Sequence, residues 1–335
     1  MNIFAVLGFV AGAAILTGLV VYAGLGPIAL AVESLGVLGL CLVAFVHLPI
    51  VALLGFAWFV LARRFKGARP QAFIWARLVR DAAGELLPFS QLGGYAVGLR
   101  ALTLAHVEAL PATVSMLVDL IVELLAKLPY ALLGLMCLAW LRAPARLLTP
   151  VFVGLAVGAV LMAVVLVLII RRRETLERLA SRMASRWPIL AHRQDRMRSA
   201  FAELLAPDRR IQVAFALHLA CWALGGFEAW LLFHLMGIGA TALQAIVIDS
   251  LFSVLRTLAF FVPGALGIQE ASYALLGALF GITPASAIAF SLARRARDFA
   301  IGIPALAAWN LQEGRRALGG ASADAAPRTP ERLHQ

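Results

Sequence analysis

Charged residues are scarce in this chain: they make up 14% of its 335 residues, while 62% are hydrophobic. Soluble domains carry about 25% charged residues, so this composition excludes an ordinary soluble protein. It predicts an all-α polytopic membrane protein, because helices satisfy their own backbone groups in lipid. Cysteine is also rare, since the sequence holds three. Isolated thiols in apolar runs give neither a disulfide framework nor metal-ligand spacing, so we expect no metal site.

Signatures of common catalytic sites are missing as well. The sequence contains no Gly-x-Ser-x-Gly, no His-Glu-x-x-His and no Walker loop, the patterns that mark hydrolases, zinc proteases and nucleotide-binding enzymes. Its six histidines show no ligand spacing. We therefore expect a protein that is not an enzyme, with no catalytic residue and no cofactor.

Long apolar runs, by contrast, recur along the chain. A run of about 20 residues can cross the hydrocarbon core of a bilayer. About eight candidate spans lie at residues 3–23, 36–61, 112–140, 149–170, 211–235, 242–262, 265–283 and 285–309. Residues 81–110 are expected to form a re-entrant hairpin. Residues 1–316 would then form the membrane domain, and residues 317–335 a disordered cytoplasmic tail.

The charge that is present is mainly basic, with a formal net charge of +11. It is concentrated in residues 61–80 and 171–210, beside apolar runs. The positive-inside rule places both segments, and with them both termini, on the cytoplasmic side of a bacterial inner membrane. Such segments attract anionic headgroups of the inner leaflet. No nucleic-acid-binding motif accompanies them, so we expect no nucleic acid partner.

Residues 171–210 also have the periodicity of two amphipathic helices. Two interpretations remain open for this segment. The helices could lie on the inner leaflet, or they could offer a docking surface to an enzyme of lipid biosynthesis.

A short motif occurs twice, each time inside a stretch that would otherwise be an unbroken helix. Each copy has an arginine, then a proline seven or eight residues later, then glycine. The residues of the two helix breaks are Pro88, Gly93, Gly94, Pro263, Gly264 and Gly267. Broken helices in matching positions of two halves indicate a transport site. We expect helices that restart after Gly93-Gly94 and after Gly267 to point free N–H groups at a cavity, which would favour an anion.

Several charges fall within the apolar runs. Asp119, Glu123 and Lys127 follow each other at helical spacing and share one face. Glu123 and Lys127 are spaced to neutralise each other, which leaves Asp119 in need of a partner. The complete set of predicted substrate-path residues is Arg80, Glu85, Asp119, Glu123, Lys127, Asp249, Arg256, Glu270, Arg294, Arg297 and Asp298.

Two interpretations of these charges remain open. They could line a polar path in which Arg256, Arg294 and Arg297 capture a phosphate or other anionic headgroup. Alternatively, they could form a structural ion-pair network, with Arg294 and Arg295 reaching to the inner surface. Asp119, Glu123 and Glu270 are the carboxylates we would expect in proton coupling.

The second motif, Leu255-Arg-Thr-Leu-Ala-Phe-Phe-Val-Pro-Gly-Ala-Leu-Gly-Ile-Gln-Glu270, resembles the flippase-like integral membrane family typified by the transmembrane part of lysylphosphatidylglycerol synthases. Glu85-Leu-Leu-Pro-Phe-Ser-Gln-Leu-Gly-Gly94 resembles the matching half. Together with Ala293-Arg-Arg-Ala-Arg-Asp298, the pattern is most similar to the hopanoid-biosynthesis-associated HpnL-type branch.

This resemblance implies that the protein moves or handles a polar-headed lipid, anionic or hopanoid-type, between leaflets. The synthases carry a soluble aminoacyl-transfer domain after the spans and this sequence does not, so we expect no synthesis of the charged lipid. One alternative is a non-transporting accessory protein that organises lipid-synthesis enzymes at the inner membrane. A second alternative is a membrane enzyme that acts on lipid headgroups.

Overall fold

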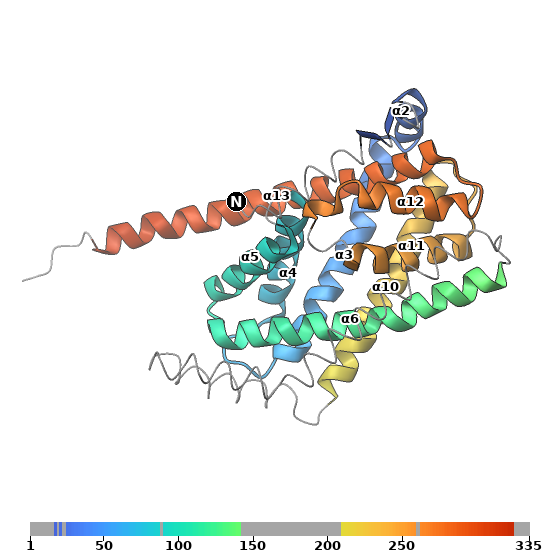
Figure 1. Ribbon diagram of the computed structural model, residues 1–335. Coiled ribbons are helices and arrows are strands. Elements are labelled where there is room, and N and C mark those ends of the chain that lie inside the picture. Colours follow the sequence, from blue (N-terminus) through green and yellow to red (C-terminus); the bar gives the residue numbers. More distant parts are fainter. Residues whose placement is uncertain are drawn as a thin grey trace, which may run out of the picture.

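The computed structural model describes residues 17–18, 20–21, 25–87, 90–141, 209–258 and 262–324 (Figure 1). These ranges contain α-helices and one short 3-10 helix, and no strand among them. The prediction of an all-α protein is therefore confirmed. The helices are α2 (Leu25–Glu33), α3 (Gly36–Ala62), α4 (Pro70–Leu86), α5 (Ser90–Leu104), α6 (Ala109–Trp140), α10 (Arg210–Leu235), α11 (Ala242–Leu258), η1 (Pro263–Ala265), α12 (Ile268–Ala278) and α13 (Pro284–Asp324).

Three of the described helices, α3, α6 and α10, are long and apolar enough to cross a membrane. They contain 27, 32 and 26 residues, and at about 1.5 Å per residue each is longer than the roughly 30 Å hydrocarbon core. Large apolar side chains such as Leu38, Phe45 and Met136 are exposed on them. An exposed apolar surface of this kind fits contact with lipid.

The prediction of a span at residues 265–283 is wrong. This stretch holds the end of η1, the 11-residue helix α12 and a turn, and 11 residues cover only about half of the hydrocarbon core. Glycines at positive φ cause the interruptions: φ is 58° at Gly264, 74° at Gly267 and 73° at Gly281.

Other parts of the predicted topology lie outside the described residues. These are most of the span at 3–23, all of the span at 149–170, and residues 171–208 of the basic segment. At the C-terminal end, α13 continues to Asp324, so residues 317–324 are helical where a disordered tail is expected; residues 325–335 are not described.

The described helices fall into two halves with the same order of elements. A long helix (α3 or α10) is followed by a broken pair (α4 with α5, or α11 with η1 and α12) and then by a second long helix (α6 or α13). Pro111 and Pro284 lie in the first turn of α6 and of α13. The repeat seen in the sequence therefore corresponds to a repeat of helices.

The two halves pack through exchanged contacts. Helices α3 and α10 lie against each other, α6 packs on α11, and α13 packs on α4, so each half's last long helix covers the broken helix of the other half. Figure 1 shows α3 and α10 crossing between α6 and α13. The interface between the halves is therefore built from the same elements that carry the predicted charges.

The first broken pair is a tight antiparallel hairpin. Helix α5 folds back along α4, and a Cβ at Gly94 would lie 2.5 Å from the Arg80 carbonyl oxygen, which leaves no room for a side chain there. Helix α5 begins at Ser90, so Gly93 and Gly94 lie inside its first turns, and the prediction that the helix restarts after them is wrong. Pro88 lies outside the described residues.

Candidate functional site: a charged network and an acid-lined cleft between the halves

The charges of the first half gather around two arginines of α4. The Arg77 guanidinium donates to both carboxylate oxygens of Glu123, at 2.9 and 3.0 Å, and its Nε donates to Asp81 at 2.7 Å. Arg80 donates through Nε to Asp81 at 3.1 Å and through Nη2 to Glu123 at 3.5 Å. Its guanidinium also lies 5.1 Å from the centre of the Tyr95 ring. Both arginines are buried, although residues 61–80 were predicted to be a cytoplasmic segment.

Asp119 completes this group from α6 and is fully buried. Its Oδ1 lies 3.0 Å from Nε2 of His218 on α10, which is also fully buried. Its Oδ2 lies 3.7 Å from Arg80 Nη1 and 3.9 Å from Arg77 Nη1. We call this set the α4–α6 cluster; its members are Arg77, Arg80, Asp81, Asp119, Glu123 and His218.

Lys127 has partners on another helix. Its ammonium donates to Thr257 Oγ1 at 2.6 Å and to the Ser253 carbonyl oxygen at 3.3 Å, and it lies 4.5 Å from the centre of the Trp222 ring. Glu123 is bound by Arg77, so the expected neutralisation of Glu123 by Lys127 is wrong. Lys127 instead holds α6 against the C-terminal turn of α11.

In the second half, Arg294 of α13 binds Asp249 of α11. Arg294 Nη1 donates to Asp249 Oδ1 at 2.6 Å and to the Tyr273 hydroxyl at 2.7 Å. The Tyr130 hydroxyl donates to the other oxygen of Asp249 at 3.0 Å. The guanidinium is also within 6.0 Å of three ring centres, those of Phe252, Tyr273 and Phe290. Arg294 is therefore held inside the helix bundle and does not reach to the surface.

The second helix break is closed by Arg295 and Glu270. Arg295 donates to Glu270 Oε1 at 2.7 Å and to the Gly264 carbonyl oxygen at 2.9 Å. Glu270 Oε2 accepts the Gly267 N–H at 2.8 Å. The N–H of Gly267, the residue that precedes α12, is thus bound by a buried carboxylate of the first turn of that helix and does not point free at a cavity.

One ion pair joins the two breaks to each other. Arg256, near the end of α11, donates to the Glu85 carboxylate near the end of α4, and to Gln269 at 2.9 Å. A Cβ at Gly264 would lie 3.3 Å from the Glu85 carbonyl oxygen. The two predicted break regions are therefore in contact, although 171 positions separate Glu85 from Arg256 in the sequence.

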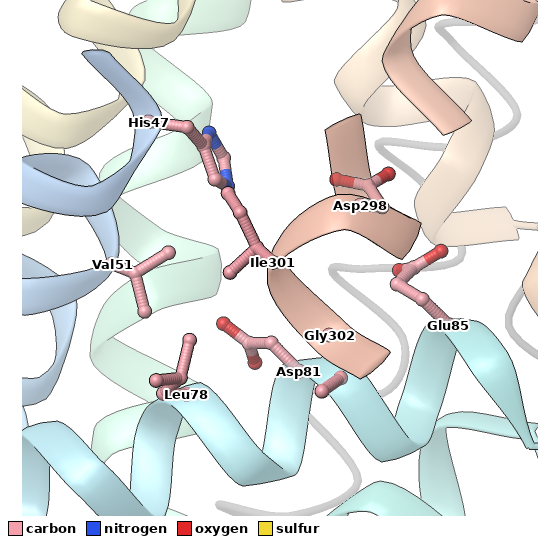
Figure 2. Close-up of a pocket in the computed structure, with 9 residues that line it drawn as sticks. His47, Val51, Leu78, Asp81, Glu85, Asp298, Ile301 and Gly302 are labelled. Carbon is pink, nitrogen blue, oxygen red and sulfur yellow. The ribbon is translucent and has the colours of Figure 1, made fainter. Parts of the chain in front are cut away.

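Beside this pair, a small, partly open cleft lies between α3, α4 and α13. Figure 2 shows the carboxylates of Asp81, Glu85 and Asp298 around it, with His47 on the opposite wall. Its apolar lining is Val51, Leu78, Ala82 and Ile301, with Gly302. His47 and Val51 flank the centre of α3, a helix long and apolar enough to cross a membrane, so the cleft lies beside the middle of that helix.

Behind the cleft, Glu228 of α10 is buried and binds two partners. Its Oε2 lies 2.7 Å from His47 Nδ1, and its Oε1 accepts from Arg297. Arg297 also donates to Asp298 Oδ1 at 2.7 and 3.0 Å. Helices α3, α10 and α13 therefore meet in one network whose outer members face the cleft.

The structure thus brings together most of the predicted residues, in a different pattern from the one expected. Arg256, Arg294 and Arg297 each bind a carboxylate of the protein itself. Among the described residues that line the cleft there is no arginine or lysine. Sequence reasoning missed Arg77, Asp81, His47, His218 and Glu228 as members of these networks. These residues are polar and lie inside or beside apolar runs, and this is the one feature of the sequence that could have indicated their place in the networks.

The comparison with protein families agrees with this architecture. The profile of the lysylphosphatidylglycerol synthase transmembrane region matches residues 9–305. The chain belongs to this family. No curated protein and no solved structure matches it. Membership makes it a membrane protein of a lipid-handling family, and similarity to the HpnL-type branch remains a prediction.

In this member of the lysylphosphatidylglycerol synthase transmembrane-region family, the cleft can hold a small polar group. Each of its carboxylates already accepts from an arginine of the protein: Asp81 from Arg77 and Arg80, Glu85 from Arg256 and Asp298 from Arg297. Its apolar wall suits the start of an acyl or other hydrocarbon chain. In the described ranges, no group of three His, Cys, Asp or Glu side chains is placed to hold a metal ion.

Proposed function

We propose that this protein moves polar-headed lipids between the leaflets of a bacterial inner membrane. One observation carries the proposal: the acid-lined cleft lies at the middle of a spanning helix, between the halves of a repeated helix bundle. Charged groups inside a membrane are costly and are characteristic of substrate and ion pathways. A site near the midplane at the interface of two repeats is the arrangement used by many transporters.

The lining argues for a particular kind of headgroup. Asp81, Glu85 and Asp298 line the cleft, and each is paired with an arginine. A carboxylate has lone pairs for more than one donor, so the head proposed for this cleft donates hydrogen bonds through hydroxyl or amine groups. This differs from the anionic head expected from the arginines, because those arginines bind the protein's own carboxylates. A hydroxylated, hopanoid-type head fits the cleft better than a phosphate alone.

The orientation and partners belong to the same proposal. Arg63, Arg64, Lys66 and Arg69, together with the basic residues of 171–210, favour a cytoplasmic location for these segments and for both termini; Arg77 and Arg80 belong to the buried network instead. The proposed partners are membrane lipids, with anionic headgroups of the inner leaflet near the basic segments. The reaction proposed is movement of the lipid without covalent change, by a protein that is not an enzyme.

Leaflet exchange in reconstituted vesicles tests the function. Lipids with a fluorophore on the acyl chain and an unaltered hydroxyl, amine or phosphate head are compared, and an impermeant reductant bleaches the outer leaflet. We expect faster exchange than in protein-free vesicles for hydroxyl or amine heads. Asp298→Asn should slow it, whereas Glu313→Gln, in the exposed Arg100–Glu313 pair, should not. Exchange no faster than in empty vesicles for every head would contradict the proposal and favour the accessory role.

A further inference from the structure

We propose that Asp119 and His218 form a proton-binding site whose loading drives the lipid movement proposed above, and the coupling part of this inference rests on that function. The site is the buried pair in which Asp119 Oδ1 and His218 Nε2 lie 3.0 Å apart. The ligand is a proton, bound and released without any other covalent change. Transport without a nucleotide needs such an ion if it is to run against a lipid gradient.

The first observation is a set of buried polar atoms that the packing leaves unpaired. Among the described residues, Asp119 Oδ2, His218 Nδ1 and Arg80 Nη1 are buried and have no hydrogen-bond partner. Buried polar groups are nearly always bonded, because an unmade bond costs about 1–3 kcal/mol. Asp119 Oδ2 and Arg80 Nη1 face each other at 3.7 Å, within ion-pair range but too far apart for a hydrogen bond, so the one atom of the three with no partner of either kind is His218 Nδ1.

The second observation is the charge of the α4–α6 cluster. Two guanidinium groups, those of Arg77 and Arg80, face three carboxylates within ion-pair distance. A neutral His218 leaves the set with one excess negative charge, and its most exposed member is Asp81, whose side chain is 32% exposed at the cleft while those of Asp119 and Glu123 are 0% and 14% exposed. A proton on the Asp119–His218 pair makes the set neutral. When two groups interact this closely, the proton belongs to the pair and not to either residue.

The atoms are placed for this exchange. With Asp119 ionised, His218 Nε2 carries the hydrogen that it donates to Oδ1, and Nδ1 keeps a lone pair with no donor facing it. That lone pair is where a proton can bind. Release of the proton restores the excess negative charge between α4, α6 and α10, and this weakens the contacts among the three helices.

Within the described residues, charged groups reach the surroundings of His218 from several neighbouring helices. Helix α6 contributes Asp119 and Glu123, and α4 contributes the two arginines that bind them. On α10 itself, Cys221 lies one turn away and donates to a backbone carbonyl. The ionisable groups that reach α10 from α3 and α11 are farther along it: His47 binds Glu228, and Asp249 approaches Gly225.

A continuous path joins this site to the cleft. Asp81 lines the cleft and also accepts hydrogen bonds from Arg77 and Arg80. Those arginines bind Glu123 and face Asp119. A change of charge at Asp119–His218 is therefore transmitted to a carboxylate that contacts the headgroup, through side chains that already touch.

Two measurements test the proposal. The first does not depend on transport: infrared difference spectra of the reconstituted protein are recorded between about pH 5 and pH 8, where histidine changes charge. We expect one carboxylate and one imidazole component, beyond those of the other acids and histidines, that both His218→Asn and Asp119→Asn remove and that His106→Asn leaves in place. His106→Asn is the matched control, because His106 is exposed and has a φ of 65°, which asparagine tolerates,. A wild-type signal unchanged by both variants would overturn the site.

The second measurement imposes a pH gradient across the vesicles during leaflet exchange. We expect the wild-type rate to change at least about fivefold on reversing the gradient, and both pair variants to lose this response while His106→Asn keeps it. Gradient-insensitive exchange by the wild type would overturn the coupling, whether or not the variants fold. No exchange at any pH would instead count against the proposed function and leave the infrared result to decide the proton site.

Discussion

The Asp249–Arg294 pair offers the sharpest test of the buried network. Asp249→Asn keeps the shape of the side chain and removes its charge. In the native protein Arg294 binds Asp249 at 2.6 Å and Tyr273 at 2.7 Å, and the two charged side chains are 14% and 5% exposed. The substitution leaves a buried guanidinium with a hydroxyl and aromatic faces but no carboxylate.

The size of the effect follows from that burial. Breaking a buried ion pair costs about 3–5 kcal/mol, because one charge stays in a low-dielectric interior without its counter-charge. We expect the lower end, about 3 kcal/mol, since asparagine can still accept a hydrogen bond and aromatic rings stabilise a nearby cation. Set against a total stability of about 5–15 kcal/mol, this loss would be large.

Equilibrium unfolding in mixed micelles, followed by circular dichroism, measures the loss. Glu313→Gln provides the matched control, because Arg100 and Glu313 are 56% and 26% exposed, and an exposed pair contributes about 0–1 kcal/mol. The double variant Asp249→Leu with Arg294→Met replaces the whole pair by apolar groups and should recover most of the stability. The reasoning is refuted if Asp249→Asn costs no more than Glu313→Gln.

Three further substitutions test helix packing by the same unfolding measurement. Gly55→Ala would place a Cβ 2.5 Å from the Ile74 Cα, so we expect the free energy of unfolding to fall by about 1–3 kcal/mol,. At Gly225 an added Cβ meets only a side-chain atom at 3.4 Å, so Gly225→Ala should be neutral or stabilising,. An equal loss at both positions would contradict this. Lys127→Met removes the donor to Thr257 and should cost about 1–3 kcal/mol, whereas no loss would show that this contact between α6 and α11 is unimportant,.

Much of the fold could be predicted because it follows from composition and repetition. Few charges and long apolar runs dictate a helical membrane protein. The repeated arginine, proline and glycine pattern predicts two related halves, and the described helices have that order. The failure at residues 265–283 has a local cause: three glycines at positive φ shorten the helix, and apolar content alone does not reveal this.

The pairing of the charges could not be predicted in the same way. Helical spacing places Glu123 and Lys127 on one face, but it does not include helices distant in the sequence. Arg77 lies 46 positions from Glu123, and Lys127 contacts α11. The packing of the two halves decides which charged residues pair with each other. The sequence predicts an arginine-rich anion site, whereas in the structure these arginines form internal ion pairs beside an acidic cleft.

Cysteine accessibility tests most directly the central proposal, that the acid-lined cleft beside the middle of α3 is open to water and to a headgroup. In a background with Cys41, Cys137 and Cys221 replaced by alanine, Ile301→Cys places a thiol in the cleft and Leu132→Cys places one on a surface that we assign to lipid. A membrane-impermeant thiol reagent needs a thiolate in contact with water, so we predict labelling of Ile301→Cys at least about tenfold faster than of Leu132→Cys. Equal, slow labelling of both would contradict the account.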